Sequence, residues 1–168
     1  SGDFREHPVG FFLEAILATH DRSKFEVCCY SNNPTDDAMT NRLRDSADHW
    51  RLIAKLPDEQ VVDDIRRDQI DILIDLSGHT AHNRLRVFAR RPAPIQISYL
   101  GYPGTTGLEA MDYRLTDRIA DPASAGGNFN VEETLFLPNC FLCYTPPPHI
   151  SEVSSLPAQK EGRVTFAA

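Results

Sequence analysis

Three groups of polar residues in this chain of 168 residues could carry chemistry. The first contains His7, which directly precedes Pro8. Proline often occupies the first position of a helix, so the imidazole would lie beside unpaired backbone N–H groups that attract anions. Such an imidazole could act as a general base or orient a substrate. The alternative is a surface histidine that caps a helix.

The second group, residues 77–84 (SGHTAHNR), follows the strongest strand-like run of the chain. His79 and His82 lie three positions apart without a third ligand nearby, so the spacing predicts no metal site. Ser77 together with His79 suggests a hydrolase, but the Gly-x-Ser-x-Gly nucleophile elbow is absent. A serine nucleophile also needs a base and oxyanion donors placed in space. The sequence therefore disfavours a hydrolase.

The third group is the glycine-rich segment 100–107 (LGYPGTTG). Its glycines allow the backbone to approach a ligand closely, and Thr105 and Thr106 add hydroxyl groups. The spacing fits neither a P-loop nor a dinucleotide-binding fingerprint. The segment is thus a candidate ligand-binding loop, with an ordinary turn as the alternative.

Helix-like and strand-like segments alternate along the chain and would position these groups. The expected helices cover residues 8–18, 36–47, 57–68 and 83–89, and the expected strands cover residues 25–30, 50–53, 70–76, 95–100, 112–117 and 134–137. This alternation predicts an α/β fold, a Rossmann-like three-layer (αβα) sandwich with a mainly parallel sheet. Ligands bind such sheets beyond the carboxyl ends of the strands, in the loops that lead into helices.

The pattern also predicts which residues are buried. Residues 70–76 (IDILIDL) are nearly continuous in apolar side chains, which is typical of a central strand covered on both faces. In the first helix, four apolar residues are spaced for one buried face: Phe11, Phe12, Ala15 and Ile16.

Four cysteines are present. Cys28 and Cys29 are neighbours in an expected strand and should point to opposite faces. Cys140 and Cys143 form one C-x-x-C, which is a weak zinc signal without a second pair. The pair also lacks the helix that lowers the pKa of a redox thiol, so we expect plain buried thiols.

The charge of the chain restricts its partners. Its formal net charge is −7 and its pI is about 5.3, which disfavours binding to nucleic acid. A small anionic ligand is still compatible, because a few local donors suffice to bind it. No apolar stretch is long enough to span a membrane, and no signal peptide opens the chain, so we expect a cytoplasmic protein.

The two ends of the chain suggest a part of something larger. Residue 1 begins in an apparent strand-to-helix loop, and residues 146–162 are rich in Pro, Ser and Glu, as linkers are. Residues 164–168 look like the start of another strand. We predict a domain over residues 1–145, followed by a linker and the start of a strand over residues 146–168.

Together these segments resemble the O-GlcNAc transferase/SPINDLY family of glycosyltransferases. The matching motifs are RPAPIQ at 91–96, LGYPGTTG at 100–107, MDY at 111–113 and EHP at 6–8. The segments DLSGHT at 75–80 and LPNCFLCYTP at 137–146 are most similar to the SPINDLY and bacterial members.

The resemblance implies the N-terminal lobe of a GT-B fold, without its first strand and without the second lobe. It implies inverting transfer of GlcNAc from UDP-GlcNAc to Ser or Thr hydroxyls of proteins, with no metal or other cofactor. The implied partners are the nucleotide sugar, the protein acceptor, and tetratricopeptide repeats and a second lobe in the same parent chain; this lobe alone would be inactive. Two alternatives stay open: fucose transfer from GDP-fucose, and an inactive regulatory or scaffold module.

The resemblance also assigns residues. His7 matches the family's His-Pro histidine, a candidate base or positioning group for the acceptor hydroxyl. The backbone that lines the sugar pocket corresponds to Leu100, Gly101 and Pro103, with Gly104 and Thr105 in the same loop. His79 stands where animal O-GlcNAc transferases carry tyrosine, and we assign it to the pocket lining.

Overall fold

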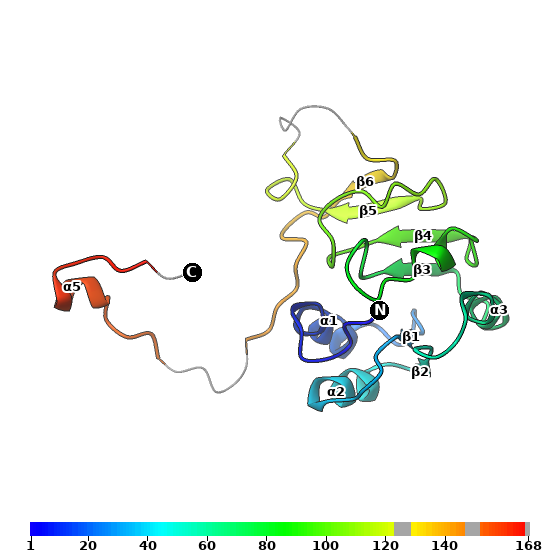
Figure 1. Cartoon of the computed structure of the whole chain (residues 1–168), viewed down its shortest axis with the longest axis horizontal. Helices are drawn as coiled ribbons and strands as arrows, with labels where there is room; N and C mark the ends of the chain where they lie inside the picture. Colours follow the sequence, from blue (N-terminus) through cyan, green and yellow to red (C-terminus); the bar gives the residue numbers. More distant parts are fainter. Residues whose placement is uncertain (123–128, 147–151, 167–168) are drawn as a thin grey trace.

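The computed structural model describes residues 1–122, 129–146 and 152–166 (Figure 1). All four predicted helices and all six predicted strands are present in the predicted order. The helices are α1 (Pro8–Thr19), α2 (Ala38–Ser46), α3 (Asp58–Arg67), α4 (Leu85–Phe88) and α5 (Pro157–Glu161), and the strands are β1 (Cys28–Ser31), β2 (His49–Leu52), β3 (Ile72–Asp75), β4 (Ile95–Ser98), β5 (Tyr113–Thr116) and β6 (Glu133–Phe136).

The described strands form two parallel sheets. β1 pairs with β2, and the larger sheet has the order β3-β4-β5-β6. Neighbouring strands are parallel throughout, which confirms the predicted α/β fold. The carboxyl ends of these strands therefore meet at common edges, where the connecting loops gather.

Helices cover the sheets from two sides. One cluster of buried side chains joins α1 and α2 to Cys29 of β1, with Leu43 at its centre. The other joins α3 and α4 to Tyr30, with Val61 fully enclosed. Cys28 packs against the second cluster, so Cys28 and Cys29 point to opposite faces as predicted. The result is the three-layer arrangement expected from the sequence.

Ser1 connects the two sheets. Its amino-terminal nitrogen donates to the carbonyl of Tyr30 at 3.0 Å, and its own carbonyl accepts from the N–H of Asn32 at 2.8 Å. Tyr30 and Asn32 flank Ser31, and hydrogen bonds from one residue to both neighbours of a residue on the next strand are the pattern of a parallel ladder. The Ser1 hydroxyl also lies 3.4 Å from the hydroxyl of Ser77, which follows β3. The loop before α1 is thus fixed against both sheets.

The prediction that the third strand is buried on both faces is wrong. Leu73 is buried in the cluster formed by α3 and α4, but Ile72 and Ile74 are 47% and 46% exposed. The cluster on the opposite side includes Leu76, beyond the end of β3. The helices α1 and α2 therefore cover the carboxyl end of residues 70–76 and leave the earlier part of the strand exposed.

The predicted buried face of α1 is also wrong. The buried residues of this helix are Val9, Gly10, Leu13 and Leu17, whereas the four predicted residues are half-buried. The helix is apolar on most sides, so periodicity does not select one face. One predicted core residue, Phe12, instead places its ring 6.1 Å from that of Tyr144.

Cys140 and Cys143 are exposed, which corrects the prediction that they are buried. The turn between them is held by its backbone, because Phe141 accepts a hydrogen bond from the hydroxyl of Tyr99 at 2.6 Å and donates one to Asp117 at 2.7 Å. With the backbone of Phe141 bonded to the domain, the flanking thiols lie at the surface.

The described residues beyond position 151 cover part of the predicted linker and of the predicted start of a strand. Residues 157–161 form the short helix α5, and residues 164–166 are in no strand. Residues 167 and 168, the end of that predicted strand, lie outside the described residues.

Asp37 caps α2 and ties it to the loop that carries His7. Its carboxylate accepts from the backbone N–H groups of Thr40 at 2.8 Å and Glu6 at 2.6 Å. We expect Asp37→Ala to lower the free energy of unfolding by about 1–2 kcal/mol, as measured by denaturant titration, because both N–H groups lose their acceptor. The exposed Asp45 of the same helix is the control, and Asp45→Ala should change it by less than about 0.5 kcal/mol. Equal effects of the two changes would contradict the capping role.

Candidate functional site

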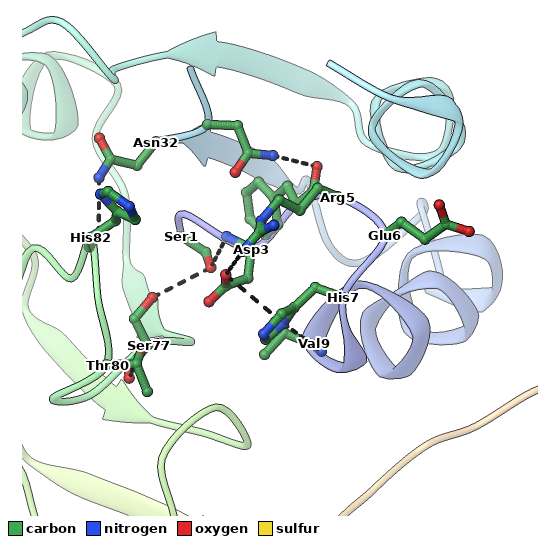
Figure 2. A network of polar contacts seen from close by, with 12 residues as sticks. Ser1, Asp3, Arg5, Glu6, His7, Val9, Asn32, Ser77, Thr80 and His82 are labelled. Carbon is green, nitrogen blue, oxygen red and sulfur yellow. Dashed lines mark hydrogen bonds and ion pairs between the residues drawn. The ribbon is translucent and has the colours of Figure 1, made fainter. Parts of the chain in front are cut away.

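The loop before α1 brings Asp3 and His7 together, with the two side chains directed toward one another (Figure 2). Oδ1 of Asp3 lies 3.9 Å from Nδ1 of His7 and 3.5 Å from the guanidinium of Arg5. The Asp3 side chain is 10% exposed, whereas the imidazole is 36% exposed. The carboxylate is thus held inside the loop, while the ring stays accessible to a substrate.

His7 also caps α1, which is the alternative that the sequence offered for this residue. Its Nδ1 accepts a hydrogen bond from the N–H of Val9 at 3.3 Å. In that arrangement a neutral ring carries its proton on Nε2, which can donate to a substrate oxygen. For Nε2 to accept a proton, Nδ1 must instead donate to Asp3, which requires the 3.9 Å separation to close to hydrogen-bond distance.

Asp75, the last residue of β3, shapes the second polar group. Its carboxylate accepts from the backbone N–H groups of Ser77 at 3.1 Å and Gly78 at 2.7 Å. Burial raises the pKa of Asp75 above its ordinary value, although these two N–H groups act in the opposite direction. The resulting turn places the Ser77 hydroxyl against Ser1, so the second group contacts the loop that carries His7.

His79 joins the second group to the glycine-rich loop. Its Nε2 lies 3.0 Å from the carbonyl oxygen of Thr106, which can only accept, so Nε2 carries the proton. Its ring meets that of Tyr102 edge-on, with centroids 5.3 Å apart. Because Ser77 and His79 bond to different partners, the structure gives no support to a hydrolase pair.

Close backbone packing fixes the glycine-rich loop. A Cβ atom on Gly101 would lie 1.8 Å from the carbonyl oxygen of Leu76, and one on Gly78 would lie 2.2 Å from Cβ of Tyr102. Leu100 has a φ of +50°, which is uncommon for a residue other than glycine. The loops that follow β3 and β4 are therefore in direct contact.

Two of the predicted pocket residues, Leu100 and Pro103, line a cavity of about 610 Å³. The remaining lining includes Arg114 and Thr116 of β5 and Phe136 of β6. Small-molecule sites usually fall in this range of volume. Two of the predicted backbone contacts thus share one cavity, while Gly101 is packed against the chain that follows β3.

The structure places the other predicted loop residues in supporting positions. A Cβ atom on Gly104 would lie 3.1 Å from the Tyr102 ring. The hydroxyl of Thr105 donates to Oε2 of Glu132 at 2.6 Å and accepts from the N–H of Gly107 at 3.0 Å. The Thr105 hydroxyl is therefore committed to the loop and not directed to a ligand.

Sequence reasoning did not find Asp3 or Glu132. The signal that could have found Asp3 is its spacing: it lies four residues before His7, and His7 is followed by Pro8. No local signal marks Glu132, which meets the glycine-rich loop across 26 residues of chain.

Within residues 1–122, 129–146 and 152–166, no three His, Cys, Asp or Glu side chains gather where they could hold a metal ion. The helices of the same residues are all too short or too polar to cross a lipid bilayer.

The loops beyond β3 and β4 and the loop before α1 thus form one polar region that includes an accessible histidine. Residues 1–149 match the family model described as glycosyl transferase family 41. The chain belongs to this family. Its relatives in family 41 include the probable UDP-N-acetylglucosamine–peptide N-acetylglucosaminyltransferases SPINDLY of Solanum lycopersicum and Arabidopsis thaliana, which are 46% and 45% identical over the whole chain.

A more distant family 41 relative is the UDP-N-acetylglucosamine–peptide N-acetylglucosaminyltransferase of Caenorhabditis elegans, 36% identical over 84% of the chain. Among solved structures, the K341M mutant of the Thermobaculum terrenum O-GlcNAc transferase is 46% identical and matches 88% of the chain with a TM-score of 0.83. This match confirms the predicted fold as a lobe of the GT-B type. The chain spans only 18% of the tomato relative and 28% of the bacterial structure.

Proposed function

We propose that the protein containing this chain transfers GlcNAc from UDP-GlcNAc to Ser or Thr hydroxyls of proteins, with inversion at the sugar. The activities for which the SPINDLY and O-GlcNAc transferase relatives are named support this proposal. The observation that carries it is the Asp3–His7 pair at the start of α1, in a loop that contacts Ser77 after β3.

In the proposed reaction, the acceptor oxygen attacks the anomeric carbon while the nucleoside diphosphate leaves from the opposite side. His7 meets the acceptor hydroxyl through Nε2 and orients it; when Asp3 takes the hydrogen bond from Nδ1–H, Nε2 accepts the hydroxyl proton. Because the transition state resembles an oxocarbenium ion, donors to the departing diphosphate matter as much as the base.

The other predicted site residues, apart from Thr105, are assigned to the sugar. Leu100, Gly101 and Pro103 offer backbone in the loop after β4, with Gly104 behind them, and His79 borders the loop at Thr106. We assign the nucleotide mainly to a second lobe outside this chain, and presentation of the acceptor to tetratricopeptide repeats in the same protein. On this assignment residues 1–145 alone are inactive.

We further propose that a strand before Ser1 lies between β1 and β3. The ladder-like hydrogen bonds of Ser1 to Tyr30 and Asn32, and its contact with Ser77 after β3, support this placement. Such a strand would join the two sheets into one.

Fucose transfer from GDP-fucose is a second candidate. The segments 75–80 and 137–146 resemble SPINDLY most, and a resemblance to SPINDLY-type O-fucosyltransferases favours this candidate. The two candidates share the lobe and the role of His7, and they differ in the nucleotide that the second lobe must select.

An assay of nucleotide release tests the proposal. The full-length protein is incubated with UDP-GlcNAc or GDP-fucose, with and without a pool of Ser/Thr-rich peptides, and free UDP or GDP is measured. Release of UDP that increases with peptide supports GlcNAc transfer, and release of GDP that does so supports the second candidate. If peptide stimulates neither reaction, the protein is not a transferase for these donors, and an inactive regulatory module becomes the better account.

Asp3 gives a separate prediction. Asp3→Asn removes the charge that would accept Nδ1–H of His7 in the proposed reaction, so we expect kcat in the full-length protein to fall about 10²-fold or more. In the His7→Ala background the same change should cost little further activity, since the two residues would act together. Full additivity of the two losses would contradict the pairing.

A further inference from the structure

Glu132 is a buried carboxylate attached to the glycine-rich loop. Its side chain is 1% exposed and stands immediately before β6. Oε1 accepts from the N–H of Thr106 at 2.6 Å and also from the Thr106 hydroxyl. Oε2 accepts from the hydroxyl of Thr105 at 2.6 Å. One carboxylate thus satisfies three donors of two consecutive loop residues.

The direction of these hydrogen bonds is fixed. The Thr106 hydroxyl accepts from the N–H of Leu108 at 3.3 Å, and the Thr105 hydroxyl accepts from the N–H of Gly107 at 3.0 Å. Each hydroxyl proton is therefore left to point at Glu132. Burial raises the pKa of Glu132, but the three donors outweigh it and hold the pKa below its ordinary value. The Glu132 side chain is therefore an ionised acceptor. Rotating the threonine hydroxyls would not give their protons another acceptor within these hydrogen bonds.

The same loop segment holds His79. The carbonyl of Thr106 accepts the proton on Nε2 of His79, and the His79 ring rests against Tyr102. Tyr102 in turn packs over Gly78. A chain of contacts therefore leads from Glu132 through Thr106 to the loop after β3, which contains the predicted pocket residue His79.

We propose that Glu132 is a positioning residue for the sugar-binding loop, acting through Thr105 and Thr106 on His79 and on the backbone at Leu100 and Gly101. This inference rests on the proposed glycosyltransferase function. Glu132 touches neither sugar nor acceptor in this account. It sets the loop geometry that the sugar meets, and a small misplacement of such groups is costly to a reaction.

The test uses Glu132→Gln in the full-length protein, with Glu109→Gln as a matched control. Glu109 lies with Thr105 and Thr106 in the connection between β4 and β5, but it is exposed. The glutamine amide would place a donor where the loop already offers three donors. We expect kcat/KM for the nucleotide sugar to fall about tenfold or more per folded molecule, which corresponds to about 1.4 kcal/mol. Glu109→Gln should leave it unchanged.

A second pair of variants covers the case in which Glu132→Gln does not fold. Thr106→Ser keeps the hydroxyl and should retain the wild-type kcat/KM, whereas Thr106→Val should lose activity as Glu132→Gln does. Hydrogen exchange of the peptide spanning residues 101–108, measured by mass spectrometry, should increase in Glu132→Gln and Thr106→Val without global loss of protection.

The outcomes separate the two claims. A wild-type protein that transfers no sugar from either donor overturns the proposed function, and this inference with it. If the wild type is active and the folded Glu132→Gln and Thr106→Val proteins keep its kcat and KM, the positioning role is wrong and Glu132 contributes to stability alone.

Discussion

Replacing His7 by alanine in the full-length protein is expected to lower kcat by about 10²–10⁴-fold, the usual contribution of a positioned acid or base. The affinity for the nucleotide should change much less, because the nucleotide is assigned to the second lobe. The reason is the placement of His7: its ring is accessible, faces Asp3, and stands at the start of α1. Steady-state kinetics and calorimetric titration of UDP measure the two effects.

The matched control is His49→Ala. His49 is exposed on β2, where its Nε2 lies 2.7 Å from Glu26. That change should alter neither kcat nor nucleotide affinity. If His7→Ala instead weakened nucleotide binding as much as turnover, His7 would be a residue that supports the fold or the nucleotide, and its assigned role toward the acceptor would fail.

Gly101→Ala is expected to be the most damaging substitution for the fold. The added methyl group would lie 1.8 Å from the carbonyl oxygen and 2.6 Å from the carbonyl carbon of Leu76. Both atoms are backbone at the end of β3, so relief requires the loops after β3 and β4 to separate. We expect a loss of about 3 kcal/mol or more in the free energy of unfolding, in the range that marks a specific steric defect.

Gly107 is the control in the same loop. Its φ is +69°, but an added Cβ would meet nothing within 4 Å. Gly107→Ala should therefore lower the free energy of unfolding only by the strain of a left-handed backbone at alanine, about 1–2 kcal/mol. Denaturant unfolding followed by the fluorescence of Trp50, the single tryptophan, measures both variants. Equal losses would show that backbone contact at Gly101 does not decide its identity.

Features encoded by nearby residues could be predicted from the sequence. α2 and α3 begin within two residues of their predicted starts, because an acidic cap at Asp37 and the Pro57–Asp58 start signal are local. The buried stripe of α3, which includes Val61 and Ile65, follows from spacing alone. The start of α1 at Pro8, with His7 as its cap, follows from local residues in the same way.

Features that depend on distant parts of the chain could not be predicted from the sequence. The exposure of Ile72 depends on where the helices of the opposite layer end, which the strand itself does not encode. The partners of the glycine-rich loop illustrate the same limit, since Glu132 reaches Thr106 across 26 residues and its sequence neighbours give no hint of a buried carboxylate. Asp3 stands between these cases: its spacing from His7 was visible, but the contact was not.

The most direct test of the transferase assignment is the covalent product. Full-length protein, a Ser/Thr-rich peptide pool and UDP-GlcNAc are incubated together, and the peptides are sequenced by mass spectrometry with a parallel GDP-fucose reaction. We expect peptides that carry one N-acetylhexosamine on Ser or Thr, and their near-absence with the His7→Ala protein. Peptides left unmodified by the folded wild-type protein with both donors would contradict the transferase assignment.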